Sequence, residues 1–554
     1  MFLMNQIYKH IIVIALCLLG GFNSYASKTS LRQALINLED PDKNVREQSY
    51  KILKEENDAT IIPVLEAFNL GLLENRDGQL VIYGPQVEVE KNRKKYPLLD
   101  AFTNKQLLDP NGNPAYTEHF SSSILRPSRA ERIVVSDLIK VLSLSHYDIE
   151  KRIAAIVSAG DRADASTLPI LKKQLQNNPE KRVSDALRQS LALIKITHGL
   201  KLERLEAVRF LGKLGSARAI LPIRHSLADD NSGDPEFIQA AQDALNKIDR
   251  YQKLIGFVQE IFSGLSLGSI LVLMALGLAV IFGLMGVINM AQGEFMMLGA
   301  FTTYVVSEIF KRSLPPDIFN YYFLFAVPAA FIISALAGLL CEWALIRHLY
   351  GCPLETLLAT WGLSLVLIQS VRVLFGDTLS LTPPDWLNGS WEVSTDLVFP
   401  INRMFIIIFC GLCTLLFFII VQKTRLGLLL RSTVQDRETA SSLGVPTRKI
   451  DGLTFALGTG LAGLAGCVIP LYDKINPGMG QGYVVDSFMV VVLGGLGKLA
   501  GVIIGGIGLG FMTKFIEPFF QAVYGKALVL GMVIVFLQWR PAGLFPSKGR
   551  LGDE

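Results

Sequence analysis

Long apolar runs recur along the second half of the chain. Several are about 20 residues long, which is the length that a helix needs to cross a membrane. Two of them are shorter, and a short apolar segment can enter and leave a membrane on the same side. The pattern predicts a polytopic helical domain of about eight or nine segments within residues 251–554, at 263–284, 290–310, 321–346, 357–375, 404–421, 453–472, 484–497, 501–519 and 526–539.

The first half has a different pattern, in which shorter amphipathic helices alternate with turns. Three segments share one arrangement, a helix followed by a short apolar stretch with a proline near its start, at Pro63, Pro169 and Pro222. Proline suits the first turn of a helix, because its missing N–H would have no partner there. Stacked helix pairs of this kind resemble HEAT repeats, so we expect an α-helical repeat domain over residues 27–250.

Residues 70–130 interrupt this array with many turn signals, among them Asp77-Gly78, Asn111-Gly112 and five prolines. Short strands are expected at 79–83 and 86–89. We interpret the segment as an irregular insertion in an otherwise all-α chain. The alternative is a docking surface for a partner outside the cytoplasm.

The first 26 residues have the pattern of an export signal. Lys9 precedes an apolar run over residues 11–21, and small residues stand at the positions expected for cleavage after Ala26. Eleven apolar residues span about 16 Å as a helix, only about half of a hydrocarbon core. A first membrane helix is the alternative interpretation. A signal peptide over residues 1–26 would place the repeat domain outside the cytoplasm.

Charge divides the chain at the same place. Asp, Glu, Lys and Arg make up 65 of the first 250 residues, or 26%, but 37 of the remaining 304, or 12%. A typical soluble protein has about 25%, so the chain is neither a single soluble enzyme domain nor a disordered scaffold. The net charge of +4 is small and dispersed, so no nucleic-acid partner is expected.

The residue types that carry catalysis or bind metals do not form a recognisable group. The six histidines are scattered, and the repeat domain has no cysteine, so it depends on its core rather than on disulfides. Cys410 and Cys413 match a CxxC motif but have no second pair. Gly458, Gly460 and Gly463 match GxGxxG inside an apolar helix, without the strand that a nucleotide site needs. We expect no catalytic residue, no cofactor and no bound metal.

Loop charges predict the orientation of the chain in the membrane. Six Lys and Arg residues lie within 423–449, whereas 376–402 contains none. The excess of positive charge places the loop 423–450 and the C-terminus in the cytoplasm. Nine crossings after an exported N-terminus give the same answer. The expected location is the bacterial inner membrane, with a periplasmic N-terminal domain.

The loop 423–450 contains the most informative motif, Glu438-Thr439-Ala440-Ser441-Ser442-Leu443-Gly444. Residues 435–443 are expected to form a short helix that fits a groove on another protein. Gly444 can end that helix in a left-handed conformation, and Pro446 prevents its continuation. The motif resembles the EAA-x-x-x-G coupling element of ABC importer permeases and departs from it at Thr439. The alternative is a solvated basic loop.

Further motifs carry the resemblance across the membrane domain. They are Gly-Leu-Ser-Leu-Gly-Ser-Ile at 264–270, Gly-Val-Ile-Asn-Met-Ala-Gln-Gly-Glu at 286–294, Pro-Leu-Glu-Thr-Leu-Leu-Ala-Thr-Trp-Gly-Leu-Ser at 353–364, Thr-Arg-Leu-Gly at 424–427 and Arg-Pro-Ala-Gly-Leu-Phe at 540–545. Together they resemble the branched-chain amino-acid permeases of ABC importers. With an exported repeat domain in front, the layout resembles the UrtB-type permease subunits of bacterial urea transporters.

This resemblance implies a non-catalytic subunit that forms part of the translocation path for urea or a short amide. It also implies four kinds of partner: a second related permease, two cytoplasmic ABC ATPases, a periplasmic substrate-binding protein and the membrane lipid. A branched-chain amino-acid permease is the alternative within the family. Outside the family, the alternatives are an ATP-independent urea or amide channel and a membrane-anchored scaffold.

Polar residues within the apolar runs are candidates for the translocation path, because burying them in a membrane is costly. Asn289 and Gln292 lie three apart, so they can face one side of a helix, and Glu294 follows closely. Capping and packing of a helix start is the competing interpretation for these three residues. The further candidates are Glu342, Asp486, Lys514 and Glu517.

Overall fold

The computed structural model describes residues 31–39, 42–56, 58–76, 79–90, 93–109, 113–117, 124–177, 180–228, 234–313, 315–350, 352–393, 396–435, 437–495, 499–520, 522–541 and 543–545. The expected export signal lies outside these residues. The chain divides into two compact units, with the division between Arg250 and Tyr251. Each unit has its own hydrophobic core.

The three similar segments of the first unit adopt the same succession of elements. A helix is followed by one turn of 3₁₀ helix and then by a helix of nine residues. Asp58 and Asp164 begin two of these turns by accepting hydrogen bonds from Thr60 and Ser166 at 2.9 and 3.0 Å. The repetition in the sequence is thus a repetition of structure, in α2 (Lys43–Glu56), η2 (Ala59–Ile61) and α3 (Ile62–Leu70), in α5 (Ile149–Asp161), η3 (Ala165–Thr167) and α6 (Leu168–Gln176), and in α8 (Lys201–Leu214), η4 (Ala217–Ala219) and α9 (Ile220–Ala228).

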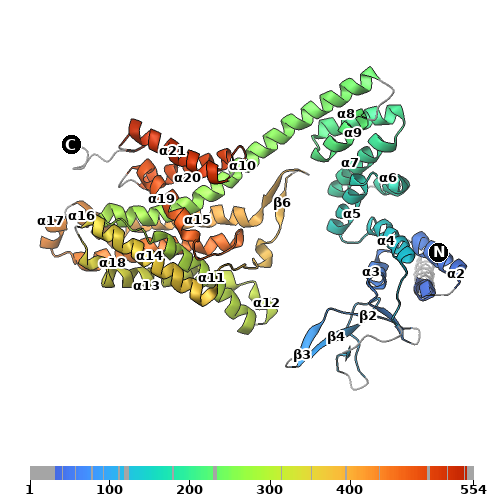
Figure 1. The fold of residues 1–554 in the computed structure, drawn as a ribbon, viewed down its shortest axis with the longest axis horizontal. Coiled ribbons are helices and arrows are strands. Elements are labelled where there is room, and N and C mark those ends of the chain that lie inside the picture. The colour runs from blue at the N-terminus through green and yellow to red at the C-terminus, as the bar shows by residue number, and fades with distance from the viewer. Residues whose placement is uncertain are drawn as a thin grey trace, which may run out of the picture. The chain divides into compact units, whose positions relative to one another are not determined.

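Longer helices join the repeated segments. Helix α4 (Arg129–Ser143) contacts α3 and α5, and α7 (Lys181–His198) packs against α5, α6, α8 and α9, as Figure 1 shows. The first turns of α10 (Pro235–Met285) complete the last layer, in which Ala244 lies against Gly212 of α8. The arrangement is a stack of helices, and its classification as HEAT-like stays a prediction.

The expected irregular insertion is wrong in one respect, because it contains an ordered antiparallel sheet. The predicted strand at 79–83 is present as β2, but Pro97 gave little reason to expect a long strand around it. The carbonyl of Pro97 accepts a hydrogen bond from the backbone N–H of Gly84 at 2.9 Å, so the proline is accommodated among the hydrogen-bonded strands. The chain is therefore mostly helical rather than all-α. The strand order is β1-β2-β4-β3 with β5 on β4, for β1 (Leu73–Arg76), β2 (Gln79–Tyr83), β3 (Val87–Glu90), β4 (Arg93–Asp100) and β5 (Tyr116–Thr117).

Within the described residues of the second unit, nine helices lie at the nine apolar runs. Among the described residues of the whole chain, six helices are long and apolar enough to cross a membrane. The number of crossings stays a prediction, because α19 and α21 are shorter and α11 is not among the six. The helices are α10, α11 (Gln292–Ser313), α13 (Tyr322–Ala344), α14 (Pro353–Phe375), α15 (Ile401–Lys423), α18 (Thr447–Val468), α19 (Met479–Gly494), α20 (Leu499–Ile516) and α21 (Ala522–Trp539).

Shorter elements connect the long helices. Two lie between α15 and α18, namely α16 (Arg425–Gln435) and α17 (Arg437–Ser442). A small hairpin precedes α15. Its strands are β6 (Ser390–Glu392) and β7 (Val398–Pro400), and α12 (Pro316–Phe319) precedes α13.

Helix α18 lies at the centre of this unit, where it packs against α11, α13 and α10, and α13 leaves its other face exposed. Glycines let their backbones approach closely, as small residues do at helix contacts in membranes. A Cβ atom on Gly458 of α18 would lie 2.7 Å from the carbonyl oxygen of Gly277 in α10. Gly299 of α11 meets Gly463 of α18 in the same way. The close packing of these helices thus depends on glycines, which have no side chain at the contact.

We expect Gly458→Ala to lower the stability of the protein by about 1–3 kcal/mol, because the added methyl group must push α10 and α18 apart. Thermal unfolding of the detergent-solubilised protein measures this as a lower midpoint. Gly362→Ala is the matched control, since nothing lies within 4 Å of a Cβ added at that position of α14. Equal midpoints for the two variants would contradict the close approach.

Candidate functional site

A short non-helical segment, residues 286–291, separates α10 from α11 and carries the first expected site residue. Gly286 has a φ of 64° and redirects the chain as α10 ends. Asn289 is fully buried, and its Oδ1 accepts a hydrogen bond from the backbone N–H of Ala291 at 3.1 Å. A helix start leaves backbone N–H groups without partners, and an asparagine side chain can satisfy one of them.

The structure brings Asn289 and Gln292 together. Asn289 Nδ2 donates to Gln292 Oε1, and Gln292 Nε2 donates to the carbonyl of Gly458, both at 3.0 Å. The hydroxyl of Thr360 in α14 accepts from the backbone of Met290 at 3.1 Å. These bonds attach the start of α11 to α18 and α14, so the polar atoms of this pair are engaged within the protein.

Glu294 lies two residues further along α11 and is 1% exposed. The hydroxyl of Ser364, on α14, lies near its carboxyl group. Its Oε2 atom has no hydrogen-bond partner within the part of the chain that the structure describes. Glu294 therefore differs from Asn289 and Gln292, because it retains hydrogen-bonding capacity.

The expected coupling motif is a separate short helix, α17, directly after α16. It begins at Arg437 rather than 435, and Glu438 lies in its first turn. Ala440 is buried and anchors the helix, while Thr439 is exposed. The side chain of Leu443 is 80% exposed. An anchored helix with an exposed outer face is suited to contact with another protein.

Gly444 ends α17 in the left-handed conformation that the sequence predicts, with a φ of 87°. The N–H of Gly444 donates to Ser441 at 3.0 Å and the N–H of Val445 donates to Ala440 at 3.0 Å. This pair of bonds is the Schellman motif, which satisfies the last carbonyls of a helix. Pro446 then precedes α18, so the connection between α17 and α18 is short and defined.

Asp486, Lys514 and Glu517, which the sequence offered as separate candidates, line one cavity of about 350 Å³. Lys514 Nζ lies 2.5 Å from Glu517 Oε2, so the two partly neutralise each other. Asp486 of α19 pairs at 3.4 Å with Lys526 of α21. Asn289, Gln292 and Glu294 are not among the lining residues.

Three further charged or polar groups of this cavity were not found from the sequence. Arg403 begins α15 and donates to the hydroxyl of Ser263 at 2.6 Å, and Asp473 follows α18. Lys526 completes the set. In the sequence, each of these residues appears only as a charge next to an apolar run. Such a charge does not indicate which helices pack together around it.

Glu342, the remaining candidate, is buried but well partnered. Its carboxylate accepts from the hydroxyl of Tyr350 at 3.0 Å and from Arg347 at 3.3 Å. These contacts are local to the end of α13. No group of three His, Cys, Asp or Glu side chains in the described ranges could hold a metal ion.

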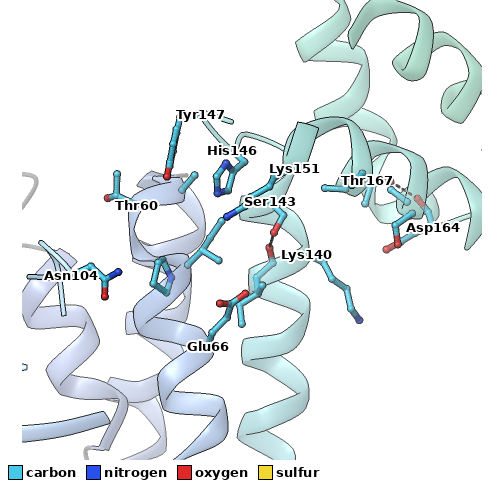
Figure 2. A pocket seen from close by; sticks show the side chains of 18 of the residues that line it. Thr60, Glu66, Asn104, Lys140, Ser143, His146, Tyr147, Lys151, Asp164 and Thr167 are labelled. Atoms are coloured by element: carbon cyan, nitrogen blue, oxygen red, sulfur yellow. Dashed lines mark hydrogen bonds between the residues drawn. The ribbon is translucent and has the colours of Figure 1, made fainter. Parts of the chain in front are cut away.

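A larger cavity, of about 660 Å³, lies in the first unit between α3 and the helices α4 and α5. Figure 2 shows His146, Tyr147 and Lys151 at one end and Glu66 at the other. Asn104 lines its edge with a φ of 55°.

Asp100 precedes the loop that contains Thr103 and Asn104. Burial alone would raise the pKa of Asp100, but hydrogen bonds from Thr103 outweigh burial and lower the pKa.

Comparison with known proteins connects the second unit to a family. Residues 260–537, half of the chain, match the family described as "Branched-chain amino acid transport system / permease component". The match contains the 286–291 segment, the coupling motif and the charged cavity. No solved structure matches the chain.

Three curated relatives align with about half of this chain. The high-affinity branched-chain amino acid transport system permease protein BraD of Pseudomonas aeruginosa is 30% identical over 295 residues, 52% of this chain and 95% of BraD. LivH of Escherichia coli is 28% identical over 306 residues, 53% and 96% of the two chains. LivM of Escherichia coli is 24% identical over 307 residues, 51% and 69%.

The family match begins within α10, so residues 31–250 lie outside it. The matched part is a transport component rather than an enzyme, and its relatives are named as permease proteins. This chain belongs to the permease-component family of branched-chain amino acid transport systems.

Proposed function

We propose that this chain is the permease subunit of an ATP-driven importer and that it carries urea or a short amide across the bacterial inner membrane. The observation that carries the first part is α17, an exposed helix closed by left-handed Gly444 within the family match. Such a helix presents a rigid face to a partner.

In this proposal Glu438, Thr439, Ala440 and Gly444 couple the permease to an ATPase. Ala440 is the buried residue that holds the helix to the rest of the permease, and the exposed face around Thr439 enters a groove on the ATPase. The Schellman motif at Gly444 fixes the angle between α17 and α18. A movement of the ATPase would then reach α18, which lies at the centre of the bundle.

The partners in this proposal are a second related permease, two cytoplasmic ATPases, a periplasmic binding protein and the surrounding lipid. The similarity to both LivH and LivM of Escherichia coli supports a pair of related permeases, since those two names belong to one organism. The apolar outer faces of α14 and α15 offer area for lipid or for the second permease.

The substrate part of the proposal depends on the layout of the chain. The relatives are named for branched-chain amino acids, but they align with only about half of this chain. An additional helical unit precedes the family match, and that layout supports urea or a short amide. A branched-chain amino acid is the second candidate, and the relatives' names favour it.

Glu294 is the best of the three residues expected along the translocation path. Asn289 and Gln292 hydrogen-bond within the protein, which supports a bracing role for them. Glu294 keeps an oxygen atom without a partner among the described residues. We place it where a passing amide could donate a hydrogen bond.

We expect Gly444→Pro to abolish ATP-driven uptake and the stimulation of ATP hydrolysis by the loaded binding protein. Proline cannot adopt a positive φ and cannot donate the hydrogen bond to Ser441. Uptake of labelled urea and leucine into proteoliposomes, together with the ATPase rate, measures the effect. Gly411→Ala, a change in α15 with nothing within 4 Å, is the control. Full uptake by Gly444→Pro, or uptake without any ATPase, would refute the proposal.

The proposed orientation makes a separate prediction. A cysteine at Ser441, in α17, should react with a membrane-impermeant maleimide only after the cells are permeabilised. A cysteine at Ser380, in the loop after α14, should react in intact spheroplasts, because the loop without positive charges faces outward. Both positions are exposed, and both variants are made in a Cys352→Ser background so that the exposed native cysteine does not react. The reverse labelling pattern would overturn the orientation.

A further inference from the structure

The charged cavity of the second unit is assembled from many parts of the chain. Residues of α10, α15, α19, α20 and α21 line it, together with the non-helical segment 472–478. Its volume of about 350 Å³ falls in the range of small-ligand pockets, about 300–1,000 Å³. Non-helical backbone among membrane helices is tolerated where it is buried in protein or lines a cavity.

The charges around this cavity balance. Three of the lining side chains are cations and three are anions, namely Arg403, Lys514 and Lys526, and Asp473, Asp486 and Glu517. A net-charged ion would meet as many like charges as opposite ones there. A solute with a negative end and a positive end can satisfy both sets at once.

Two of the three cations are paired with an anion of the cavity, so N–H donors and carboxylate acceptors lie side by side along its wall. The ion pair of Asp486 with Lys526 joins α19 to α21, and that of Lys514 with Glu517 lies at the end of α20. Arg403 bonds Ser263 with one of its nitrogen atoms. Guanidinium and ammonium groups each carry several N–H donors, so one contact does not exhaust them.

We propose that this cavity binds the transported solute, and that the solute is net-neutral with separated hydrogen-bond acceptor and donor ends. The cations would bind the acceptor end and the carboxylates the donor end. Urea and a zwitterionic amino acid share this chemistry. The inference rests on the proposed function, because it identifies where that function receives its substrate.

The test measures protection of a cysteine placed in the cavity. Ile475 and Leu379 form an isolated β-bridge, and Asn476 and Ser380 are the residues that follow them. Asn476 lines the cavity and Ser380 does not. Asn476→Cys and Ser380→Cys are each made in a Cys352→Ser background, because Cys352 is the exposed cysteine of the described chain. The assembled transporter is treated with a small methanethiosulfonate reagent, with urea or with leucine present.

We expect the solute to slow modification of Asn476→Cys but not of Ser380→Cys. At about ten times its dissociation constant, a bound solute leaves about one site in ten open, so the rate falls about tenfold. Protection by urea identifies an amide-type solute, and protection by leucine identifies an amino acid. Either result supports the cavity as the binding site.

A second pair of variants tests the charges. Asp486→Asn with Lys526→Gln removes one carboxylate and one ammonium together and keeps the net charge. We expect it to raise the solute concentration needed for protection tenfold or more, because two charge-assisted contacts are lost and one alone accounts for about tenfold. The control is Asp377→Asn with Arg372→Gln, an exposed ion pair at 3.1 Å outside the cavity.

Two outcomes would overturn the inference. One is ATP-driven uptake by a transporter in which neither urea nor leucine protects Asn476→Cys. The other is protection that is equally strong with and without the Asp486–Lys526 pair. Failure of the proposed function is a different result, because it would appear as absent ATP-driven uptake in the unmodified transporter, whatever the protection data show.

Discussion

Every backbone N–H and carbonyl that lies among apolar helices must find its partner inside the protein, and the second unit is organised around this requirement. Two non-helical segments of this unit leave backbone groups that need a partner from elsewhere in the protein. At residues 286–291, Asn289 and Thr360 supply the missing hydrogen bonds. At residues 472–478, Ile475 exchanges two backbone bonds with Leu379, each of 2.9 Å. The first segment fixes the start of α11 at the centre of the bundle. The second lines the charged cavity.

Much of this architecture follows from the sequence because apolar length and proline position are local signals. The run at 357–375 differs from α14 only in its first turn, and Gly444 has the backbone conformation that its motif predicts. The sheet around Pro97 was harder, because strand pairing depends on partners distant in the chain. The cavity was hardest. Its charged residues are spread from Arg403 to Lys526, and single charges beside apolar runs do not indicate which helices meet.

The two units have different relations to known proteins. The second unit carries the family match, helix α17 and the charged cavity, so transport can be discussed from its residues alone. The first unit is a stack of repeated helices with a sheet between α3 and α4, and it has a larger cavity of its own. Two of its three repeated segments begin their 3₁₀ turn with an aspartate cap, Asp58 and Asp164.

The glycine contacts of α11 with α18 and α19 have a mechanical consequence. Gly293 meets Gly480, and Gly299 meets Gly463, backbone against backbone. Where side chains interlock, one helix moves past another only after rotamers change, and packed interfaces therefore shift in discrete steps. Where two helices meet through glycine main chain, no rotamer has to change. The hydrogen bond from Gln292 to Gly458 holds the start of α11 to α18, so a small displacement between these two helices would pivot about that end.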